Sequence, residues 1–581
     1  MVSTIAMIST TLIKTARSFT ARLETQTVIF TLILCFVAFL VITPLVMLLV
    51  ESFDVGEPGK PTVYGLDAWE RAATTPGIKK AIYNTISLAV TRSLIATVIG
   101  IFIAWLLART DIPWKGWFEF MFWISYFLPA LPVALGWILL LDSKFGLINQ
   151  WLVMLPFIEN PPFNIHSYWG IVWVHLTATT IGIRVMLLTP AFRNLDASLE
   201  ESSRVAGAGP LKTLRRIIIP IMMPPILIAT VLGLIRSLEA FEIELILGVP
   251  IGLEVFSTKI YSWIVDEPGD FAAAGALGAF FLVILMVLVG MQQLYLRRKV
   301  FTTVTGRGFS ARPIPLGRWK WPAFALILLI VLTVTVIPTG FVFLGTFMKL
   351  FGYFNIPEPW TLDNWTHVLS DPILMSSLKN TLVLGFWSAI ISVLFCCVIA
   401  YIVVKTRFFG RELLDFLSWL PYSIPGILLG LAMIWSLLLV NNFIPIYGTM
   451  AALVIAMSIS RLPLGVQVIK SFLLQLGDEL EESSRVSGAS WLYTFRRILF
   501  PILSPCLIVV GLLTFISAAR DIGTVVLLAT GETRTLALLM LDYTAGAELE
   551  RATVVACMIV ILVIVGAVIA RVLGGQFHIR D

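Results

Sequence analysis

The chain has 581 residues, of which 58% are hydrophobic and only 13% are charged, and its net charge is +6. A soluble domain carries about 25% charged residues, so this chain cannot surround a core with a hydrated surface. The composition excludes a soluble enzyme, a disordered protein and a secreted disulfide scaffold. The five cysteines lie in apolar segments without a CxxC spacing, which is typical of small buried hydrophobic residues.

Twelve apolar segments are long enough to cross the hydrocarbon layer of a membrane, which takes about 18 residues or more as a helix. The first six cover residues 28–50, 82–108, 117–141, 168–188, 217–235 and 271–296. The other six cover residues 321–348, 380–404, 416–440, 448–469, 498–519 and 552–570. We therefore predict an all-α polytopic membrane protein, with a first six-helix half at 28–296 and a second at 321–581.

The basic residues predict which side of the membrane each loop faces, because lysine and arginine concentrate in short cytoplasmic loops. If segment 1–27 is cytoplasmic, the loops and termini on its side hold 26 of the 41 lysines and arginines. We therefore predict that both termini are cytoplasmic. Segment 297–320 has seven basic residues and no acidic one, and we interpret it as a cytoplasmic linker between the halves rather than a nucleic-acid site.

Prolines interrupt the third span of each half, at Pro129 and Pro132 and again at Pro421 and Pro425. A proline inside a helix frees a carbonyl that would otherwise accept a hydrogen bond, so we predict a kink at both places. The kinks could shape a gate or could be packing features, and the sequence leaves both readings open.

Charged residues follow the fifth span of each half and lie beside further apolar segments. They are Glu239, Glu242 and Glu244 in the first half, and Arg520 and Asp521 in the second. An apolar backbone that returns into a helix bundle is tolerated only where it is buried or lines a cavity. We therefore hypothesise that these residues line the outer mouth of a translocation pathway. The alternative is that they are ordinary charges of external loops.

A repeat connects the two halves. Residues 199–224 read LEESSRVAGAGPLKTLRRIIIPIMMP, and residues 480–505 read LEESSRVSGASWLYTFRRILFPILSP. Seventeen of the 26 aligned positions are identical at a constant offset of 281, and an Asn-Thr pair at 84–85 recurs at 380–381. Both copies lie in the loop between the fourth and fifth spans of their half, which indicates that a six-span unit was duplicated.

Each copy of the repeat predicts two short helices joined by a turn on the face of the membrane. Ser198 with Glu201, and Asp478 with Glu481, have the spacing of a helix-capping box. The glycines at 207 and 488 suit the turn, and the prolines at 220 and 501 suit the start of the next span. Small serines and apolar residues here have little of their own chain to pack against. We therefore predict that each copy inserts into the groove of a partner protein.

The repeat resembles the permease signature of ABC importers, the EAA loop, E-A-A-x3-G-x9-I-x-L-P. The spacing is kept in both copies, which read Glu201-Ser202-Ser203, Gly207, Ile217, Ile219 and Pro220, and Glu482-Ser483-Ser484, Gly488, Ile498, Phe500 and Pro501. Serines replace the alanines, and isoleucine or phenylalanine replaces the leucine. These changes exchange one small residue for another and one apolar residue for another.

The resemblance implies a type I importer permease of the bacterial inner membrane, with its two halves fused in one chain. In that family the loop docks on a separate ATPase, so the expected partners are two ATPase copies, a periplasmic solute-binding protein and the lipid bilayer. Glu201 and Glu482 would contact the ATPase, and the glycines would form the turn. The expected coupling residues are Glu200, Glu201, Ser202, Ser203, Gly207 and Pro220, with Glu481, Glu482, Ser483, Ser484, Gly488 and Pro501. Fused permeases of this form look most like those for ferric iron, although thiamine, phosphonate and polyamine permeases are similar.

The chain has no G-x-x-x-x-G-K-[ST] loop, so we expect no enzymatic activity, cofactor or metal site of its own, with ATP bound by the partner. An ion-gradient-driven carrier with twelve spans is the alternative from another class, and it would need an ionisable relay inside the spans. The candidates for such a relay are predicted to lie toward the span ends, and they are Arg92, Glu119, Arg184 and Arg461. The carrier hypothesis also leaves the repeat without a role.

Overall fold

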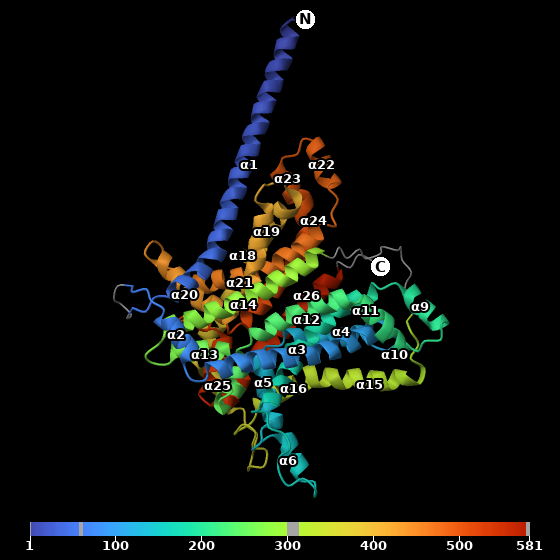
Figure 1. The fold of residues 1–581 in the computed structure, drawn as a ribbon, viewed down its shortest axis with the longest axis vertical. Helices are drawn as coiled ribbons and strands as arrows, with labels where there is room; N and C mark the ends of the chain where they lie inside the picture. Colours follow the sequence, from blue (N-terminus) through green and yellow to red (C-terminus); the bar gives the residue numbers. More distant parts are fainter. Residues whose placement is uncertain (1, 57–61, 299–312, 577–581) are drawn as a thin grey trace.

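The computed structural model describes residues 2–56, 62–298 and 313–576, and every named element in these ranges is a helix (Figure 1). Residues there pair in strand-like fashion only at three isolated bridges. The predicted all-α class is therefore confirmed.

Nine helical segments of the described ranges are long and apolar enough to cross a membrane. Each overlaps one of the twelve predicted spans. They are α1 (Val2–Glu51), α3 (Ile78–Arg109), α7–α8 (Tyr168–His175 and Ile181–Arg193), α14 (Phe271–Arg298), α15–α16 (Lys320–Val331 and Ile337–Gly345), α18 (Pro372–Lys405), α21 (Met450–Leu473), α24 (Phe500–Ala519) and α26 (Leu549–Gln576).

The other three predicted spans are bent. The third span of the first half breaks between α4 (Lys115–Phe127) and α5 (Ala130–Leu141) at 101°, and its counterpart breaks between α19 (Arg411–Trp419) and α20 (Gly426–Asn441) at 114°. Pro129 precedes α5 and Pro425 precedes α20, so the predicted proline kinks are confirmed. The fifth span of the first half bends by 74° before α12 (Met223–Leu238).

The backbone after the fifth span is also bent in the first half, where residues 244–251 meet α13 (Phe256–Val265) at 83°. In the second half, turns at 522–529 lead to α25 (Leu536–Ala545). The repeated Asn-Thr pair holds these segments in place. Asn84 donates to a carbonyl just before α13 and Thr85 accepts from the first amide of α13, each at 3.0 Å. Asn380 and Thr381 make the same contacts before α25, at 2.9 and 2.8 Å.

The first span of each half packs against the broken third span of the other half. Helix α1 lies along α20, and α15 and α16 lie along α4 and α5. Phe324 of α15 contacts Phe118 of α4, with ring centroids 5.3 Å apart. Gly136 of α5 lies so close to α16 that an added Cβ would be 2.3 Å from the carbonyl oxygen of Pro338. Such close helix contacts through small residues are a common packing device inside membranes.

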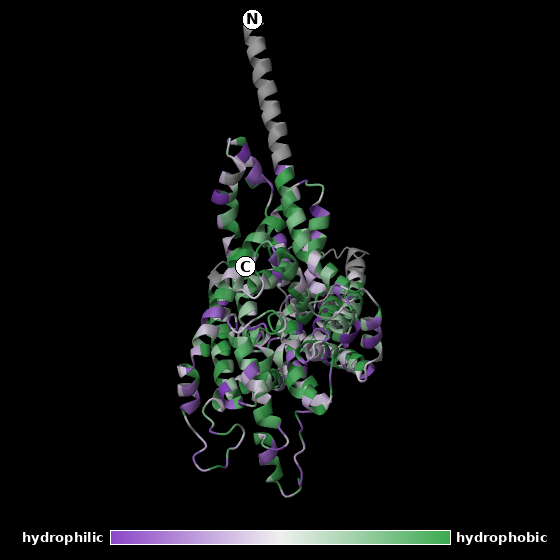
Figure 2. Cartoon of the chain, turned by 90° about the vertical axis from the view of Figure 1, so that its left-hand side faces the viewer, coloured by the Kyte–Doolittle hydropathy of each residue, from purple (hydrophilic) through white to green (hydrophobic). Residues whose placement is uncertain are grey.

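Contacts between loops divide them into two sets, which match the two predicted sides of the membrane. Within the predicted outer set, the joined pairs include Arg71 with Asp270 and Asp371 with Tyr543. Within the predicted cytoplasmic set, they include Arg109 with Glu200, Lys405 with Asp478, and Thr110 with Ile314. The body between the loops is largely apolar (Figure 2). Residues 299–312 of the predicted linker lie outside the described residues, and which side is cytoplasmic stays a prediction.

Candidate functional site

Both copies of the repeat fold into the predicted pair of short helices. The first forms α9 (Ala197–Val205) and α10 (Pro210–Thr213), and the second forms α22 (Glu479–Val486) and α23 (Trp491–Thr494). Figure 1 shows α22 and α23 projecting at the top of the view and α9 and α10 at the right. Gly207 and Gly488 form the turns at φ +76° and +82°, with open space around each. The left-handed backbone therefore favours glycine there.

The two helices of each loop are joined by a buried hydrogen bond. Ser203 Oγ lies 2.8 Å from Thr213 Oγ1, and Ser484 Oγ lies 2.8 Å from Thr494 Oγ1. The expectation that the serines have little of their own chain to pack against is therefore wrong for Ser203 and Ser484, which stabilise the loop from inside. The two bonds sit at equivalent positions of the repeat, so the loops are alike in structure as well as in sequence.

The outer surface of each loop is uncovered. Glu201 and Glu482 are exposed, as are Ser202 and Ser483. Val205 is 90% exposed and Val486 is 89% exposed. Pro220 and Pro501 lie in the first turn of the helices that follow, as predicted. Exposed valines this close to a cluster of carboxylates give each loop a polar surface with an apolar end, which suits contact with a partner protein.

Asp478 does not cap α22, contrary to the prediction. Its carboxylate instead accepts from Lys405 Nζ at 2.7 Å, and the hydrogen bond and charge of Lys405 hold the pKa of Asp478 below its usual range. The side chain of Ser198, the other predicted cap, lies outside the described residues. The start of α22 is therefore fixed by a contact with the end of α18 rather than by a capping box.

Glu200 anchors the first loop to its own half. Arg109, the last residue of α3, donates to both carboxylate oxygens of Glu200, at 3.0 and 2.7 Å, and to the carbonyl of Leu195 at 3.1 Å. Arg109 and Glu200 are both buried. Glu200 was predicted to belong to the coupling surface, but its side chain points into the protein. A force on the loop would therefore reach α3 directly.

The second loop is anchored by different chemistry. Glu481, which corresponds to Glu200, is buried and accepts from Tyr401 at 3.2 Å and Arg485 at 3.4 Å. Lys405 stands where Arg109 stands in the first half, at the offset of 296 that also relates the Asn-Thr pairs. The offset relates Arg109 to Lys405 but does not indicate their partners in the loops, and the prediction of coupling residues missed both.

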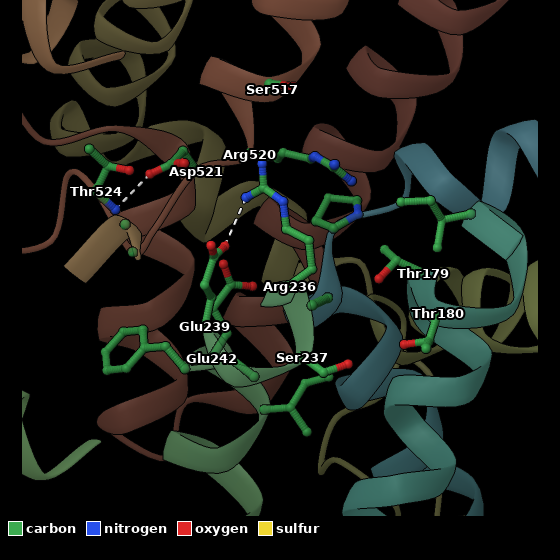
Figure 3. Close-up of a pocket in the computed structure, with 18 of the residues that line it drawn as sticks. Thr179, Thr180, Arg236, Ser237, Glu239, Glu242, Ser517, Arg520, Asp521 and Thr524 are labelled. Carbon is green, nitrogen blue, oxygen red and sulfur yellow. Dashed lines mark hydrogen bonds and ion pairs between the residues drawn. The ribbon is translucent and has the colours of Figure 1, made fainter. Parts of the chain in front are cut away.

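A cavity of about 300 Å³ lies between the two halves. Four of the five residues predicted for the pathway line it, namely Glu239, Glu242, Arg520 and Asp521. Figure 3 shows Arg236, Glu239 and Glu242 on one wall and Asp521 and Thr524 on another. Glu239 accepts from Arg236 at 2.9 Å, and Asp521 lies 3.4 Å from Arg461 and accepts from the backbone of Thr524 at 2.8 Å. The side chains predicted to form a pathway therefore meet at one place.

Two arginines reach reciprocally across this cavity. Arg236 of the first half lies over the ring of Tyr422, 4.8 Å from its centroid, and Arg520 of the second half lies 5.8 Å from that of Tyr126. Arg520 also donates to the carbonyls of Tyr126 and Leu128, each at 3.0 Å. Leu128 lies in the break between α4 and α5, so its carbonyl is outside the hydrogen-bond ladder of either helix. The proline kinks thus supply contacts between the halves.

Glu244, the fifth predicted residue, lies behind the cavity wall. Its carboxylate oxygen is 3.0 Å from Arg92 and 2.8 Å from His175 Nε2, and Arg92 also donates to the carbonyl of Ser237. Arg92 and Glu244 are almost completely buried. This charged group lies deep in the bundle, beside the middle of α3, so the expectation that Glu244 belongs to an outer mouth is wrong.

Three arginines also lie deeper than predicted. Arg92, Arg184 and Arg461 come from the central parts of α3, of the segment formed by α7 and α8, and of α21, and all three line the cavity. The prediction that they lie toward span ends is wrong because the helices extend several residues beyond the apolar segments. Glu119 does lie near an end and pairs with Arg193. Within the described ranges, no three His, Cys, Asp or Glu side chains are grouped so that they could hold a metal ion.

Comparisons with known proteins assign the family. Residues 96–302 and 382–577 match the family described as binding-protein-dependent transport system inner membrane component. The chain is 27% identical to a ferric transport system permease protein FbpB of Actinobacillus pleuropneumoniae, over 86% of this chain and 71% of that one. It is 27% identical to a putative ferric transport system permease protein of Haemophilus influenzae, over 86% of this chain and 78% of that one.

Two further proteins align with a smaller part of the chain. The sulfate transport system permease protein CysT of Salmonella typhimurium is 33% identical over 28% of this chain and 61% of its own. A bacterial ABC transporter for import of the acidic polysaccharide alginate aligns with 48% of this chain and 97% of its own, at 18% identity and a TM-score of 0.41. The family match covers more than half of the chain and falls once in each half. The chain therefore belongs to the family of binding-protein-dependent transport system inner membrane components.

Proposed function

We propose that this chain is the permease subunit of an ATP-driven importer. Two copies of a separate ATPase bind the two repeat loops from the cytoplasm, where both termini also lie. A solute-binding protein brings the cargo to the opposite face of the membrane. When the ATPases close on ATP, they move the loops together, and the two halves rock so that the cavity opens inward.

The pair of matched, uncovered loops carries this proposal. Each loop presents an exposed carboxylate and a nearly fully exposed valine, and each is held rigid by its own Ser–Thr hydrogen bond. A rigid loop transmits force better than a flexible one. The first loop joins α3 through Arg109 and Glu200, and α3 also carries Arg92 at the cavity. A mechanical path therefore runs from the loop to the cavity along one helix.

Ferric iron is the cargo that we propose. The two ferric permeases align with 86% of the chain, whereas the sulfate permease aligns with only 28%. Thiamine, phosphonate and polyamines are the alternatives within the same class of importer.

An ion-gradient-driven carrier is the second candidate function. The buried group of Arg92, Glu244 and His175 favours it, because ionisable groups deep in a helix bundle commonly serve as proton relays. The carrier mechanism gives no role to the repeat loops, and therefore we rank it second.

Uptake of radioactive iron distinguishes the two candidates. We expect uptake by cells that carry the permease, its ATPase and its binding protein to stop when ATP is depleted and to persist when a protonophore collapses the proton gradient with ATP maintained. The importer proposal is wrong if the protonophore stops uptake while ATP stays high. An ATPase subunit without catalytic activity serves as the control.

A further inference from the structure

The cavity between the halves is rich in arginine. Five arginine side chains line it, namely Arg92, Arg184, Arg236, Arg461 and Arg520. The carboxylates in or directly behind its wall are four, namely Glu239, Glu242, Glu244 and Asp521. With His175 neutral, the cavity therefore carries an excess of positive charge in a place where uncompensated charge is costly.

Three of the carboxylates are already engaged by arginine. Arg236 bonds Glu239, Arg92 and His175 bond Glu244, and Arg461 faces Asp521. Glu242 alone among these four forms no hydrogen bond or ion pair with the described residues. A bare metal cation or a polyamine would have to displace these arginines to reach most of the oxygens, while five guanidinium groups repel it.

Two of the arginines contact only uncharged partners. Arg184 is 1% exposed and donates to the hydroxyl of Ser93 at 2.8 Å and to the carbonyl of Thr180 at 3.4 Å. Arg520 donates only to the carbonyls of the broken third span. Neither has a carboxylate within ion-pair distance among the described residues. Neither guanidinium is therefore paired with a carboxylate, although Glu242 and Asp521 lie near enough to Arg520 to attract it.

The position of Arg184 is built into the helix packing. Its stem passes Gly100 of α3, where an added Cβ would lie 2.4 Å from Arg184 Cβ. Its guanidinium passes Gly233 of α12, where an added Cβ would lie 1.9 Å from Nη2. Two glycines on two helices thus make the slot that leads this side chain to the cavity wall. A buried charge for which two helices leave room in this way is typical of a functional position.

We propose that the cavity binds its cargo through an anionic, oxygen-rich group. Guanidinium groups hold phosphate and carboxylate oxygens with paired N–H donors, and neither Arg184 nor Arg520 forms an ion pair with a carboxylate of the described residues. A cavity of about 300 Å³ has room for a small oxyanion or for a small metal chelate. This inference rests on the proposed function and names its substrate class: iron crosses the cavity as an anionic complex, or the cargo is itself an oxyanion.

The test measures binding to the purified full chain with its ATPase in lipid nanodiscs. Equilibrium dialysis with radiolabelled phosphate, citrate and ferric citrate probes the anionic ligands, and radiolabelled spermidine probes a cation. We expect one or more of the anions to bind and spermidine not to bind. Binding of phosphate or citrate alone identifies an oxyanion site, whereas binding of ferric citrate alone identifies a site for the metal complex.

Variants that neutralise one charge each test whether the cavity prefers a negative or a positive ligand. Glu242→Gln removes the negative charge that has no partner, so it should tighten anion binding about threefold or more, and Arg184→Gln should weaken it about tenfold or more. Arg236→Gln, at a more exposed wall position, should weaken it as well and covers the case in which Arg184→Gln does not fold. Glu159→Gln, at an exposed position of a loop outside the cavity, removes the same charge as Glu242→Gln and should have no effect.

Two outcomes of these binding measurements would overturn the inference. If spermidine binds and Glu242→Gln weakens that binding, or if no anion binds the wild-type chain, the cavity is not an anion site. Dependence of uptake on the ATPase is measured separately, so the importer proposal can stand when this inference fails. Conversely, if uptake proves independent of the ATPase, the binding measurements still decide whether the cavity binds anions.

Discussion

The double substitution Glu201→Lys with Glu482→Lys is expected to release the ATPase from the permease and to reduce uptake to background. Both carboxylates are exposed on the outer surface of the repeat loops, so the change leaves the permease itself folded. Losing one partner of a buried charge pair at a protein interface commonly costs about 2–5 kcal/mol, and the cost is repeated at the second loop. Co-purification of a tagged permease with the ATPase measures the result.

Single substitutions and a matched control sharpen this prediction. Glu201→Lys or Glu482→Lys alone should leave one loop bound and give an intermediate loss of ATPase. Glu412→Lys makes the same charge change at an exposed position of α19, outside the repeat, and should leave the complex intact. Retention of the full ATPase complement by the double variant would show that these carboxylates are not part of the interface.

Breaking the buried pair of Arg109 and Glu200 is expected to produce the largest loss of stability among substitutions in the loops. The two groups share two hydrogen bonds and are nearly inaccessible to water. Removal of one partner leaves a buried charge unpaired, which costs about 3–5 kcal/mol. Arg109→Gln or Glu200→Gln should therefore lower the melting temperature of the purified permease, measured by tryptophan fluorescence in detergent.

The double variant Arg109→Met with Glu200→Leu separates charge from packing. Replacing both charges by apolar side chains removes the desolvation penalty together with the attraction, so most of the lost stability should return. Asp478→Asn is the control, because the Asp478 carboxylate is 77% exposed in its contact with Lys405, and a charge that water already solvates contributes far less stability than a buried one. The interpretation fails if Asp478→Asn is as destabilising as Glu200→Gln.

The fold could be predicted largely because the membrane imposes simple rules. Apolar length predicted where helices cross, and the two prolines of each third span predicted the breaks before Pro129 and Pro425. The repeat predicted the paired loops and their turns at Gly207 and Gly488, since a left-handed turn restricts the choice of residue. These are properties of short stretches of chain, and a sequence displays them directly.

Contacts between distant segments could not be predicted in the same way. Nothing near Glu200 in the sequence indicates that its partner is Arg109, because the two are brought together only by the packing of α3 against the loop. A hydropathy pattern also does not indicate that the first span of each half packs against the third span of the other half. The arginines at 92, 184 and 461 did indicate a functional position, because a charge inside an apolar span is energetically costly and is usually retained for function. Their convergence on one cavity required the three-dimensional structure.

Cysteine labelling tests most directly whether the loops are held by the ATPase. Val205→Cys and Val486→Cys place a thiol at a nearly fully exposed position of each loop, and replacing the exposed Cys35 by serine removes the one other exposed thiol among the described residues. Both new thiols should react rapidly with a maleimide in the isolated permease and fall to background in the purified complex with the ATPase. If both remain fully reactive in an intact complex, the ATPase binds elsewhere and the loops do not couple it to transport.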